Sequence, residues 1–390
     1  MIHYEQAYQI MLNHAAFVGA HRVPYEQSLH RVLAESIKAD RDMPPFHKSG
    51  VDGYACMEPV KGQELRVMEI IPAGDEPTQP LKRGTCSKVM TGAQVPANTT
   101  HVVMVERAES LDYHTVRLGE PGRKTNIAVQ GEDFRQGDRI LPAGTLLLPQ
   151  HIAILAAVGW VNPLVGQPPS IGLITTGNEL VEPHQKPDSG QIRNTNASQL
   201  LSQFRKMDLY PRYSGIVWDS QDTLLETLKS SLARHHLTIL TGGVSMGDYD
   251  YVPEMMEKAG VKVLFHKIAM KPGKPTIFGS ANGSLVLGLP GNPVSTFLQF
   301  ELFVKPLVYK LMGGHHQPVA LRLPLGEDIQ QKSSDRDSWK PVYIHAGKVY
   351  PLAYHGSGHI HALARAEGFI CVPAGETRVK KGTTVDVRQI

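Results

Sequence analysis

The sequence predicts a multidomain α/β protein in which a doubly wound α/β domain is joined to smaller domains of other classes. The chain has 390 residues, too many for a single hydrophobic core. Strand and helix patterns alternate between about residues 170 and 314, which is typical of a doubly wound sheet. Short strand patterns separated by proline and glycine turns fill about residues 65–116 and 318–390, which indicates two further β-rich parts.

Composition excludes several classes of protein. Hydrophobic residues make up 41% of the chain and the formal net charge is +3, with no dense run of Lys and Arg, so we expect no nucleic-acid partner. Cys56, Cys86 and Cys371 form no CxxC pattern, which argues against a zinc knuckle or a disulfide framework. No apolar run approaches ~20 residues and the first residues do not resemble a secretory signal. We therefore expect a cytoplasmic protein without a membrane partner.

The N-terminal region is expected to be a helical domain that an inserted β-rich domain interrupts. Apolar residues on one helical face predict a helix over about residues 4–20, and a second helical pattern covers about residues 25–34. The segment PQHIAILAAVGW, residues 149–160, predicts a helix after the β-rich insertion. The predicted division is a discontinuous helical and extended domain of residues 1–41 with 132–168, and a β-rich domain of residues 42–131.

The next segment carries the alternating pattern of the α/β domain. SIGLITTG, YPRYSGIVWD and LTILTGG are predicted strands. NTNASQLLSQFRKM is a predicted helix, with Asn196 and Gln199 spaced as in a capping box, and DTLLETLKSSLARHH is another. We place the α/β domain at residues 169–316 and a small C-terminal β-barrel domain at residues 317–390.

A glycine-rich turn, TGGVSMG, follows one of these predicted strands. Ligands of a doubly wound sheet bind beyond the carboxyl ends of its strands, and glycines let backbone N–H groups converge on an anion. The Walker pattern is excluded because no lysine follows the last glycine. Three further strand ends carry glycine, acidic or hydroxyl groups, so we expect a binding site along this edge of the sheet. Its candidate residues are Thr176, Gly177, Gly242, Gly243, Ser245, Gly247, Asp248, Pro290, Gly291, Asn292 and Pro293.

Acidic residues share this edge with the proposed anion cradle. Mg²⁺ prefers oxygen ligands and bridges carboxylates to phosphates, so Glu179, Asp219 and Asp250 are candidate Mg²⁺ ligands. Alternatively, each acid caps a helix or solvates a loop. The run MKPGKP places Lys271 and Lys274 on a proline-stiffened loop that suits an oxyanion, although surface Lys-Pro loops without such a function are common.

Eight motifs occur in order along the chain: MPPFHKSGVDGYA, MTGAQVP, NIAVQGEDFRQGD, TTGNELV, LTGGVSMGDYDYV, MKPGKPTIFG, GLPGNPVSTF and GSGHIHAL. On these motifs the whole chain resembles the molybdopterin molybdenumtransferase (MoeA) family, to which the E domain of gephyrin belongs. The resemblance implies an elongated, four-domain homodimer with its site between subunits. It also implies that adenylylated molybdopterin and molybdate react with Mg²⁺, AMP is released, and molybdenum remains on the dithiolene. An adenylyltransferase of the same pathway and acceptor molybdoenzymes are implied as partners.

The same resemblance implies roles for particular residues. The catalytic group would be Asp52 of VDGYA, Thr91 of MTGA and Asp133 of GED, together with Glu179, Asp219 and Asp250, of which the last three also hold the cation. The glycine turn and the PGNP turn would contact the pterin or its phosphate. The molybdate ligands would be Lys271, Lys274, Arg336 and Ser357.

Two departures from the family pattern affect the last domain. Pro341 stands about where a second Arg is expected, and Ala362 stands where Ser is usual. An Arg-to-Pro change removes a bidentate oxyanion donor, which Lys340 replaces in part. A specialised paralogue or a gephyrin-like scaffold with reduced turnover therefore stays open, as does a nucleotide-processing relative that shares only the α/β domain. The retained acids and lysines favour catalysis.

Overall fold

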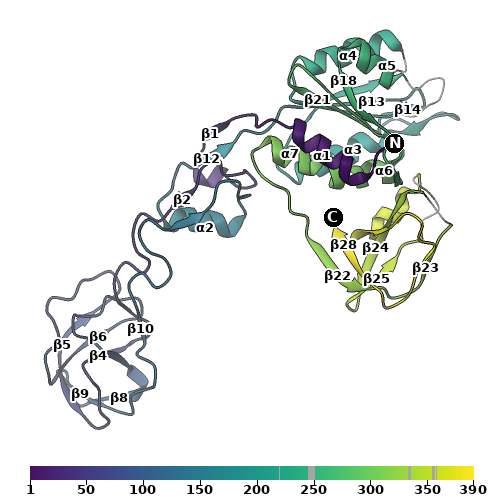
Figure 1. Cartoon of the computed structure of the whole chain (residues 1–390). Helices are drawn as coiled ribbons and strands as arrows, with labels where there is room; N and C mark the ends of the chain where they lie inside the picture. Colours follow the sequence, from purple (N-terminus) through teal and green to yellow (C-terminus); the bar gives the residue numbers. More distant parts are fainter. Residues whose placement is uncertain (219, 245–250, 333–334, 354–355, 357) are drawn as a thin grey trace. The chain divides into compact units, whose positions relative to one another are not determined.

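The computed structural model describes residues 1–218, 220–244, 251–332, 335–353, 356 and 358–390 (Figure 1). The chain forms two compact units. The larger unit comprises Met1–Glu35, Ala143–Pro149 and Asn162–Ile390, and the smaller unit comprises Ser36–Pro142 and Gln150–Val161. The division into four domains that the sequence predicts is finer than this and stays a prediction.

The smaller unit is built on a six-stranded sheet with strand order β7-β4-β6-β5-β9-β8. Apolar residues of the sheet form two clusters, one around Tyr54 and Leu65 and the other around Ala55 and Ile71, because neighbouring residues of a strand point to opposite faces. The strands are β4 (Gly53–Cys56), β5 (Glu64–Ile71), β6 (Thr85–Val89), β7 (His101–Met104), β8 (Ala108–Ser110) and β9 (Thr115–Leu118). The β-rich character that the sequence predicts here is confirmed.

Short strand pairs, single-turn helices and one α-helix complete the N-terminal half. They are β1 (Ala20–Arg22) with β12 (Leu164–Gly166), β2 (Ile37–Lys38) with β11 (Arg139–Leu141), β3 (Lys48–Ser49) with β10 (Ile127–Ala128), the 3-10 turns Tyr25–Gln27 and Val105–Arg107, and α2 (Pro149–Ala157). The helix predicted at residues 149–160 is thus confirmed as α2.

The larger unit contains the predicted doubly wound sheet, with strand order β16-β13-β17-β21-β20-β18. The first four strands of this order are parallel, and β20 and β18 are antiparallel to their neighbours. Every residue of β13, β17 and β21 is buried, as expected for parallel strands that helices cover on both faces. The strands are β13 (Ile171–Thr176), β16 (Arg212–Val217), β17 (Leu237–Thr241), β18 (Lys262–His266), β20 (Ile277–Ala281) and β21 (Ser284–Leu289).

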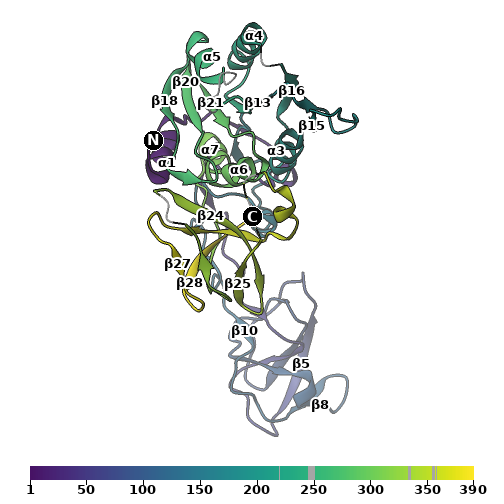
Figure 2. The same cartoon turned by 90° about the vertical axis from the view of Figure 1, so that its right-hand side faces the viewer.

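Helices cover both faces of this sheet (Figure 1, Figure 2). α4 and α5 pack on one face around Leu228 and Met255, and α1, α3, α6 and α7 pack on the other around Phe204 and Leu307. α6 continues through a π-helical segment, Phe300–Val304, into α7. The helices are α1 (Tyr4–His14), α3 (Thr195–Arg205), α4 (Gln221–Leu232), α5 (Val252–Lys258), α6 (Pro293–Gln299) and α7 (Lys305–Leu311).

The C-terminal sheet has strand order β19-β24-β26-β28-β22, and β25 pairs with β24. Its first strand, β19, comes from the α/β part of the chain and pairs with β24 in parallel, with Lys271 opposite Ser338. Trp339 and Phe369 of this sheet belong to the same apolar cluster as the α/β helices. The remaining elements are β14 (Leu180–Val181), β15 (Ile192–Arg193), β19 (Met270–Lys271), β22 (Ala320–Pro324), β23 (Ile329–Gln330), β24 (Asp337–His345), β25 (Lys348–Pro351), the 3-10 helix Ile360–Arg365, β26 (Gly368–Val372), β27 (Arg378–Val379) and β28 (Thr384–Gln389).

The helix predicted over residues 25–34 is wrong, since only the 3-10 turn forms there. His30 has a φ of 61°, which interrupts a right-handed helix. Val32 and Leu33 instead form isolated β-bridges to Leu146 and Val165, and all four side chains lie in the interior or at its edge. Pairing with distant segments therefore overrides the local helical pattern.

The first helix is shorter than predicted. α1 ends at His14, because the backbone of its C-cap residue, Ala15, is already extended, with φ −81° and ψ 104°. Within the described ranges, no helix combines the length and the apolar character that a membrane crossing requires.

Candidate functional site

A cavity of about 920 Å³ opens beyond the carboxyl ends of β13, β17 and β21. It is lined by residues of the turns that follow these strands, by the first turn of α3, and by residues near β14 and β15. Of the residues that the sequence singled out, the structure brings together here Thr176, Gly177, Glu179, Gly242, Gly243, Pro290, Gly291, Asn292 and Pro293. The strand ends therefore meet at one edge of the sheet, as the sequence predicts. That these residues bind a ligand stays a prediction.

The turn after β17 requires glycine because it lies directly against the end of β13. Gly242 has a φ of 94°, and a Cβ atom on it would lie 2.3 Å from the backbone oxygen of Thr176. Real Cβ atoms do not approach backbone that closely, and a φ in this range is unfavourable for other residues. The glycine thus allows the two strand ends to form one continuous wall of the cavity.

The side chain of Asn196 ties three segments of the site together. Its Nδ2 donates to Thr241 Oγ1 at 2.9 Å and to the backbone oxygen of Gly291 at 2.7 Å. Thr241 Oγ1 in turn donates to the backbone oxygen of Pro290 at 3.1 Å. One amide in the first turn of α3 therefore fixes the turns that follow β17 and β21.

The capping box predicted at Asn196 and Gln199 is wrong. The N-cap of α3 is Asn194, whose side chain accepts a hydrogen bond from the backbone N–H of Ala197 at 3.1 Å. Asn196 lies two residues further along, inside the helix, where its side chain is directed to the strand ends. The sequence pattern NTNAS offers two asparagines of similar capping propensity, and only the tertiary partners distinguish them.

Two buried polar atoms of the cavity lining have no hydrogen-bond partner within the described residues: Thr176 Oγ1 and Asn196 Oδ1. Leaving such a group unsatisfied costs about 1–3 kcal/mol. Native proteins contain few of these atoms, and a bound ligand is one way to satisfy them. Both atoms therefore suit a ligand that offers hydrogen-bonding groups at this end of the cavity.

One acidic and one basic side chain stand among the described lining residues. Glu179 is exposed, and its carboxylate lies so close to Gly177 that a Cβ atom there would be 2.7 Å from Oε2. Arg193 donates from Nε to the backbone oxygens of Pro183 and Gln185, at 3.1 and 3.2 Å, which anchors it beside the cavity. Sequence reasoning missed Arg193, because a single Arg in QIRN carries no spacing signal.

Only part of the predicted Mg²⁺ site can be placed. Asp219 and Asp250 lie outside the described residues, as do Ser245, Gly247 and Asp248 of the predicted substrate site. Glu179, the third predicted ligand, presents an exposed carboxylate at the edge of the cavity, and this is the oxygen chemistry that Mg²⁺ prefers. In the part of the chain that the structure covers, no three His, Cys, Asp or Glu side chains gather as a metal site.

Gln299 of α6 hydrogen-bonds to the backbone of the predicted molybdate loop, the MKPGKP segment. Gln299 Nε2 donates to the backbone oxygen of Gly273 at 2.8 Å, and Thr276 Oγ1 donates to the same oxygen at 2.7 Å. Lys271 and Lys274 are both exposed, and Pro275, which follows them, lines the cavity. The loop therefore borders the cavity while both ammonium groups remain accessible.

Lys340 lies close to Lys271, although the two residues are far apart in sequence. Lys271 is opposite Ser338 across the β19–β24 pair, and Lys340 is two residues further along β24, on the same face. Burial and the charge of Lys271 lower the pKa of the Lys340 ammonium. Neither lysine forms an ion pair with a carboxylate among the described residues.

The other last-domain positions are only partly described. Arg336 lies next to β24, with its Nε 3.5 Å from Asp335 Oδ1, and Ser357 lies outside the described residues. Pro341 is within β24, opposite Phe369, and its backbone oxygen accepts from the N–H of Leu352. Ala362 is buried in the 3-10 helix Ile360–Arg365.

The predicted catalytic residues Asp52, Thr91 and Asp133 all belong to the smaller unit. Thr91 donates to Asp52 Oδ1 from its backbone N–H and from its hydroxyl, at 2.6 and 2.7 Å. These bonds hold the pKa of the Asp52 carboxyl below its usual range, the hydroxyl bond first. The exposed Asp133 donates its backbone N–H to Met43 at 3.0 Å, so its loop pairs with the segment that leads to Asp52.

Three protein-family models match the chain and together cover most of it. Residues 2–159 match the MoeA N-terminal region (domain I and II). Residues 172–310 match a probable molybdopterin binding domain, and residues 322–390 match the MoeA C-terminal region (domain IV).

Full-length relatives agree with these matches. A molybdopterin molybdenumtransferase of Staphylococcus aureus is 34% identical over 98% of this chain and 94% of its own length. One of Staphylococcus epidermidis is 34% identical over 93% of this chain and 89% of its own. The crystal structure of a molybdopterin biosynthesis MoeA protein from Pyrococcus horikoshii superimposes with a TM-score of 0.85, at 29% identity and full coverage of both chains.

Proposed function

The chain belongs to the molybdopterin molybdenumtransferase (MoeA) family, and on this premise we propose that it inserts molybdenum into adenylylated molybdopterin and releases AMP. Family membership by itself makes the chain a transferase of molybdenum cofactor biosynthesis. The adenylylated form of the substrate, the release of AMP, the need for Mg²⁺ and a homodimer are parts of the proposal.

The cavity at the strand ends is the observation that supports this reaction most directly. Its volume of about 920 Å³ is within the range of small-molecule and cofactor sites. A pterin offers several donors and acceptors, which suit the unpartnered Thr176 Oγ1 and Asn196 Oδ1. The glycine turn at Gly242 and Gly243 carries no Cβ atoms, so a phosphate could approach the backbone closely there.

The lysines would hold the second substrate. Molybdate is a dianion that must approach a substrate already carrying negative phosphates, so repulsion opposes the encounter. Lys271 and Lys274 on the loop beside Pro275 would offset this repulsion, and Lys340 would add a third positive charge close to Lys271. In this chain Lys340 would thereby replace in part the oxyanion-binding Arg that is expected at the position of Pro341.

The carboxylates have separate tasks in this scheme. Asp52 stays ionised because Thr91 donates two hydrogen bonds to it, so it serves as a fixed negative charge rather than as a proton donor. Glu179 at the edge of the cavity, with Asp219 and Asp250, would hold Mg²⁺. The ion would supply electrostatic stabilisation of the phosphoanhydride when its bond to AMP breaks.

The test is an assay of both products. Purified protein is incubated with adenylylated molybdopterin, molybdate and Mg²⁺, AMP is quantified by chromatography, and cofactor is measured by reconstitution of an apo-molybdoenzyme. We expect AMP and active cofactor in the wild type, and strong losses of both in Asp219→Ala and Asp250→Ala. Asp222→Ala, at an exposed position in the first turn of α4, is the matched control.

Each outcome separates one part of the proposal from the rest. Absence of AMP from the wild-type reaction refutes the proposed function. Tight binding of the adenylylated substrate without turnover would instead indicate a specialised paralogue or a scaffold with the same fold. AMP release at the wild-type rate in Asp219→Ala or Asp250→Ala would remove those residues from the cation site while the function stands. Sedimentation of the purified protein tests the homodimer.

A further inference from the structure

One short helix connects the strand-end cavity to the predicted molybdate loop. α6 begins at Pro293, in the turn that lines the cavity, and its last residue, Gln299, hydrogen-bonds to the loop. Seven residues of α-helix span about 10 Å, so the two predicted binding sites are joined by one short element. The sequence motifs do not reveal this connection, because Gln299 lies outside all eight of them.

The start of α6 is bound to the wall of the cavity. Thr296, which is fully buried, donates from Oγ1 to the backbone oxygen of Pro290 at 2.6 Å. Gln199 of α3 donates from Nε2 to the backbone oxygen of Pro293 at 3.0 Å. The first turn of α6 is therefore fixed relative to the turn after β21 and to α3.

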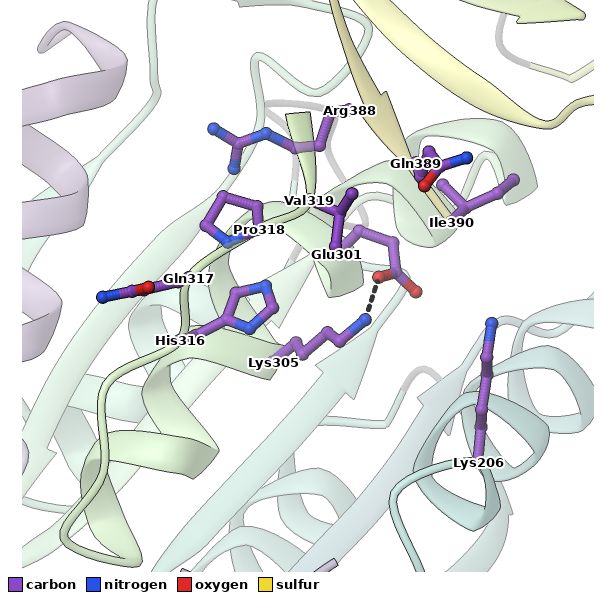
Figure 3. A pocket seen from close by; sticks show the side chains of 10 residues that line it. All are labelled: Lys206, Glu301, Lys305, His316, Gln317, Pro318, Val319, Arg388, Gln389 and Ile390. Atoms are coloured by element: carbon purple, nitrogen blue, oxygen red, sulfur yellow. Dashed lines mark hydrogen bonds and ion pairs between the residues drawn. The ribbon is translucent and has the colours of Figure 1, made fainter. Parts of the chain in front are cut away.

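The helix is also fixed beyond Gln299. Glu301, in the π-helical segment that follows α6, forms an ion pair of 2.9 Å with Lys305, which Figure 3 shows as a dashed line. The other carboxylate oxygen of Glu301 accepts a hydrogen bond of 3.0 Å from Gln203 of α3. Phe300 of the same segment is buried in the core. Gln299 is therefore attached to a helix that is held on both sides of it.

Gln299 contacts the loop through its amide nitrogen. The residue is fully buried, and its Nε2 donates to the backbone oxygen of Gly273 at 2.8 Å and to Thr276 Oγ1 at 2.5 Å. Thr276 is equally buried and donates to the same Gly273 oxygen at 2.7 Å. Gly273 and Thr276 flank Lys274 in the chain, and Lys271 lies two residues before Gly273. These hydrogen bonds therefore fix the backbone that carries Lys274 relative to the backbone of Lys271.

The amide oxygen of Gln299 is buried and has no hydrogen-bond partner among the described residues. The nitrogen and oxygen of this amide cannot exchange places, because the Gly273 oxygen can only accept a hydrogen bond. A buried acceptor without a donor lowers the stability of the folded state. Native proteins keep few such groups, and functional sites are where stability is given up for position. Gln299 therefore suits a role in placing the loop better than a role in stability.

We propose that Gln299 is a positioning residue for the transfer of molybdenum: through α6 it holds the loop with Lys274 at a fixed distance from the substrate in the strand-end cavity. This inference rests on the proposed function and names the element that sets the separation of the two substrates. Without the amide, Lys271 would stay in β19, paired with β24, and Ile277 would still begin β20. The residues between them would lose their attachment to α6, so molybdate binding would have to order the loop, which costs affinity.

The test compares two buried glutamines that differ in what they hold. Gln299→Met keeps a side chain of similar size and removes the hydrogen bonds to the loop. Gln203→Met on α3 is the matched control. Gln203 is also buried, and its amide oxygen likewise lacks a partner within the described ranges, but its Nε2 donates to Glu301 and to the Phe297 backbone rather than to the loop.

Molybdate binding is measured by calorimetry without the second substrate, and thermal unfolding is followed in parallel. We expect Gln299→Met to bind molybdate about tenfold more weakly than the wild type, as for a loop that has to be ordered on binding. Its melting temperature should be no lower than that of Gln203→Met, which should bind molybdate as the wild type does. Thr276→Val removes the other side chain that holds Gly273 and should also weaken binding, so it tests the same contacts if Gln299→Met does not fold.

Steady-state kinetics give a readout that a purely structural role would not change. In the AMP assay, Gln299→Met should raise the KM for molybdate by a similar factor and leave kcat unchanged, since both lysines are still present. A fall in kcat with an unchanged KM would contradict the proposal.

Three binding results would also overturn the proposal. The first is undiminished molybdate affinity in Gln299→Met. The second is an equal loss in Gln299→Met and Gln203→Met, which would trace the effect to a general loosening of the helices. The third is a wild type that does not bind molybdate, in which case the AMP assay alone decides the proposed reaction. Weaker binding in Gln299→Met but not in Gln203→Met, together with an absence of AMP in the wild type, would keep the positioning role and refute the transfer reaction.

Discussion

Thr91 donates two hydrogen bonds to one carboxylate oxygen of Asp52, from its backbone N–H at 2.6 Å and from its hydroxyl at 2.7 Å. Donors that point at a carboxylate favour its ionised form. The pair therefore holds the pKa of Asp52 below its usual range, without the help of burial, which acts in the opposite direction. MTGA and VDGYA, 39 residues apart at these positions, thus form one electrostatic unit.

Removal of the Thr91 hydroxyl should raise the pKa of Asp52. In Thr91→Ala the backbone donor remains, so the pKa should rise only part of the way to its usual value, whereas Thr91→Ser should leave it low. A carboxyl ¹³C NMR titration measures both. Because the native pKa of Asp52 is depressed, its contribution to stability is present above the unfolded pKa and is lost as the pH falls through the folded value. An identical pKa in wild type and Thr91→Ala would contradict this account.

Loss of the Asn196 side chain should loosen the strand-end cavity. Asn196→Ala removes two hydrogen bonds to Thr241 and Gly291, and we expect unfolding to become easier by about 1–3 kcal/mol. Substrate affinity should also fall, because the turns after β17 and β21 lose the side chain that hydrogen-bonds to both. Urea denaturation and substrate titration measure the two effects, with the exposed Ser198→Ala on the same helix as control. Unchanged affinity would show that the turns keep their positions without Asn196.

Gly273→Ala should destabilise the predicted molybdate loop, and by more than the same substitution costs at a glycine with free space around it. Gly273 has a φ of 113°, and a Cβ atom on it would lie 2.4 Å from Gln299 Nε2. Gly283, with a φ of 83° and no neighbour within 4 Å, is the matched control for backbone strain alone. Strain of this kind costs about 1–3 kcal/mol, and we expect Gly273→Ala to exceed Gly283→Ala in denaturant unfolding and to weaken molybdate binding. Equal losses in both variants would mean that Gln299 simply moves aside.

Lys340→Met should stabilise the protein at neutral pH and weaken molybdate binding. Burial and Lys271 lower the pKa of Lys340, so the unfolded state binds its proton more readily than the folded state does. Stability should therefore rise with pH between the lowered folded pKa and the usual lysine value of 10.5, and this rise should shrink in Lys340→Met. We expect a gain of roughly 1 kcal/mol or less at neutral pH.

Thermal unfolding as a function of pH and molybdate titration measure the Lys340 effects. Lys348→Met, at an exposed position on β25, is the control and should change neither property. If Lys340→Met gains stability while its affinity for molybdate stays the same, Lys340 does not bind molybdate. It would then not replace the Arg that the family pattern places near Pro341.

Much of the site follows from the sequence because its signals are local. A buried strand followed by glycines, and Pro293 at the start of α6, mark strand–turn–helix units whatever surrounds them. The alternation of such units implies a parallel sheet, and a parallel sheet brings the carboxyl ends of its strands to one edge. Nine predicted residues accordingly line one cavity.

The sequence by itself determined the class of the sheet, the turns at its edge and the family to which the chain belongs. Each of these depends on short motifs whose residues are close together along the chain. The tertiary structure decided which of two asparagines caps α3 and which one donates to Thr241 and to Gly291, the latter 95 residues from Asn196. It also decided that Val32 and Leu33 form β-bridges where the sequence predicts a helix, and that Lys340 lies beside Lys271. Each of these outcomes depends on contacts between residues that are distant in sequence and become neighbours only in the folded chain. The local conformational preferences of the residues differ too little to predict such contacts from the sequence.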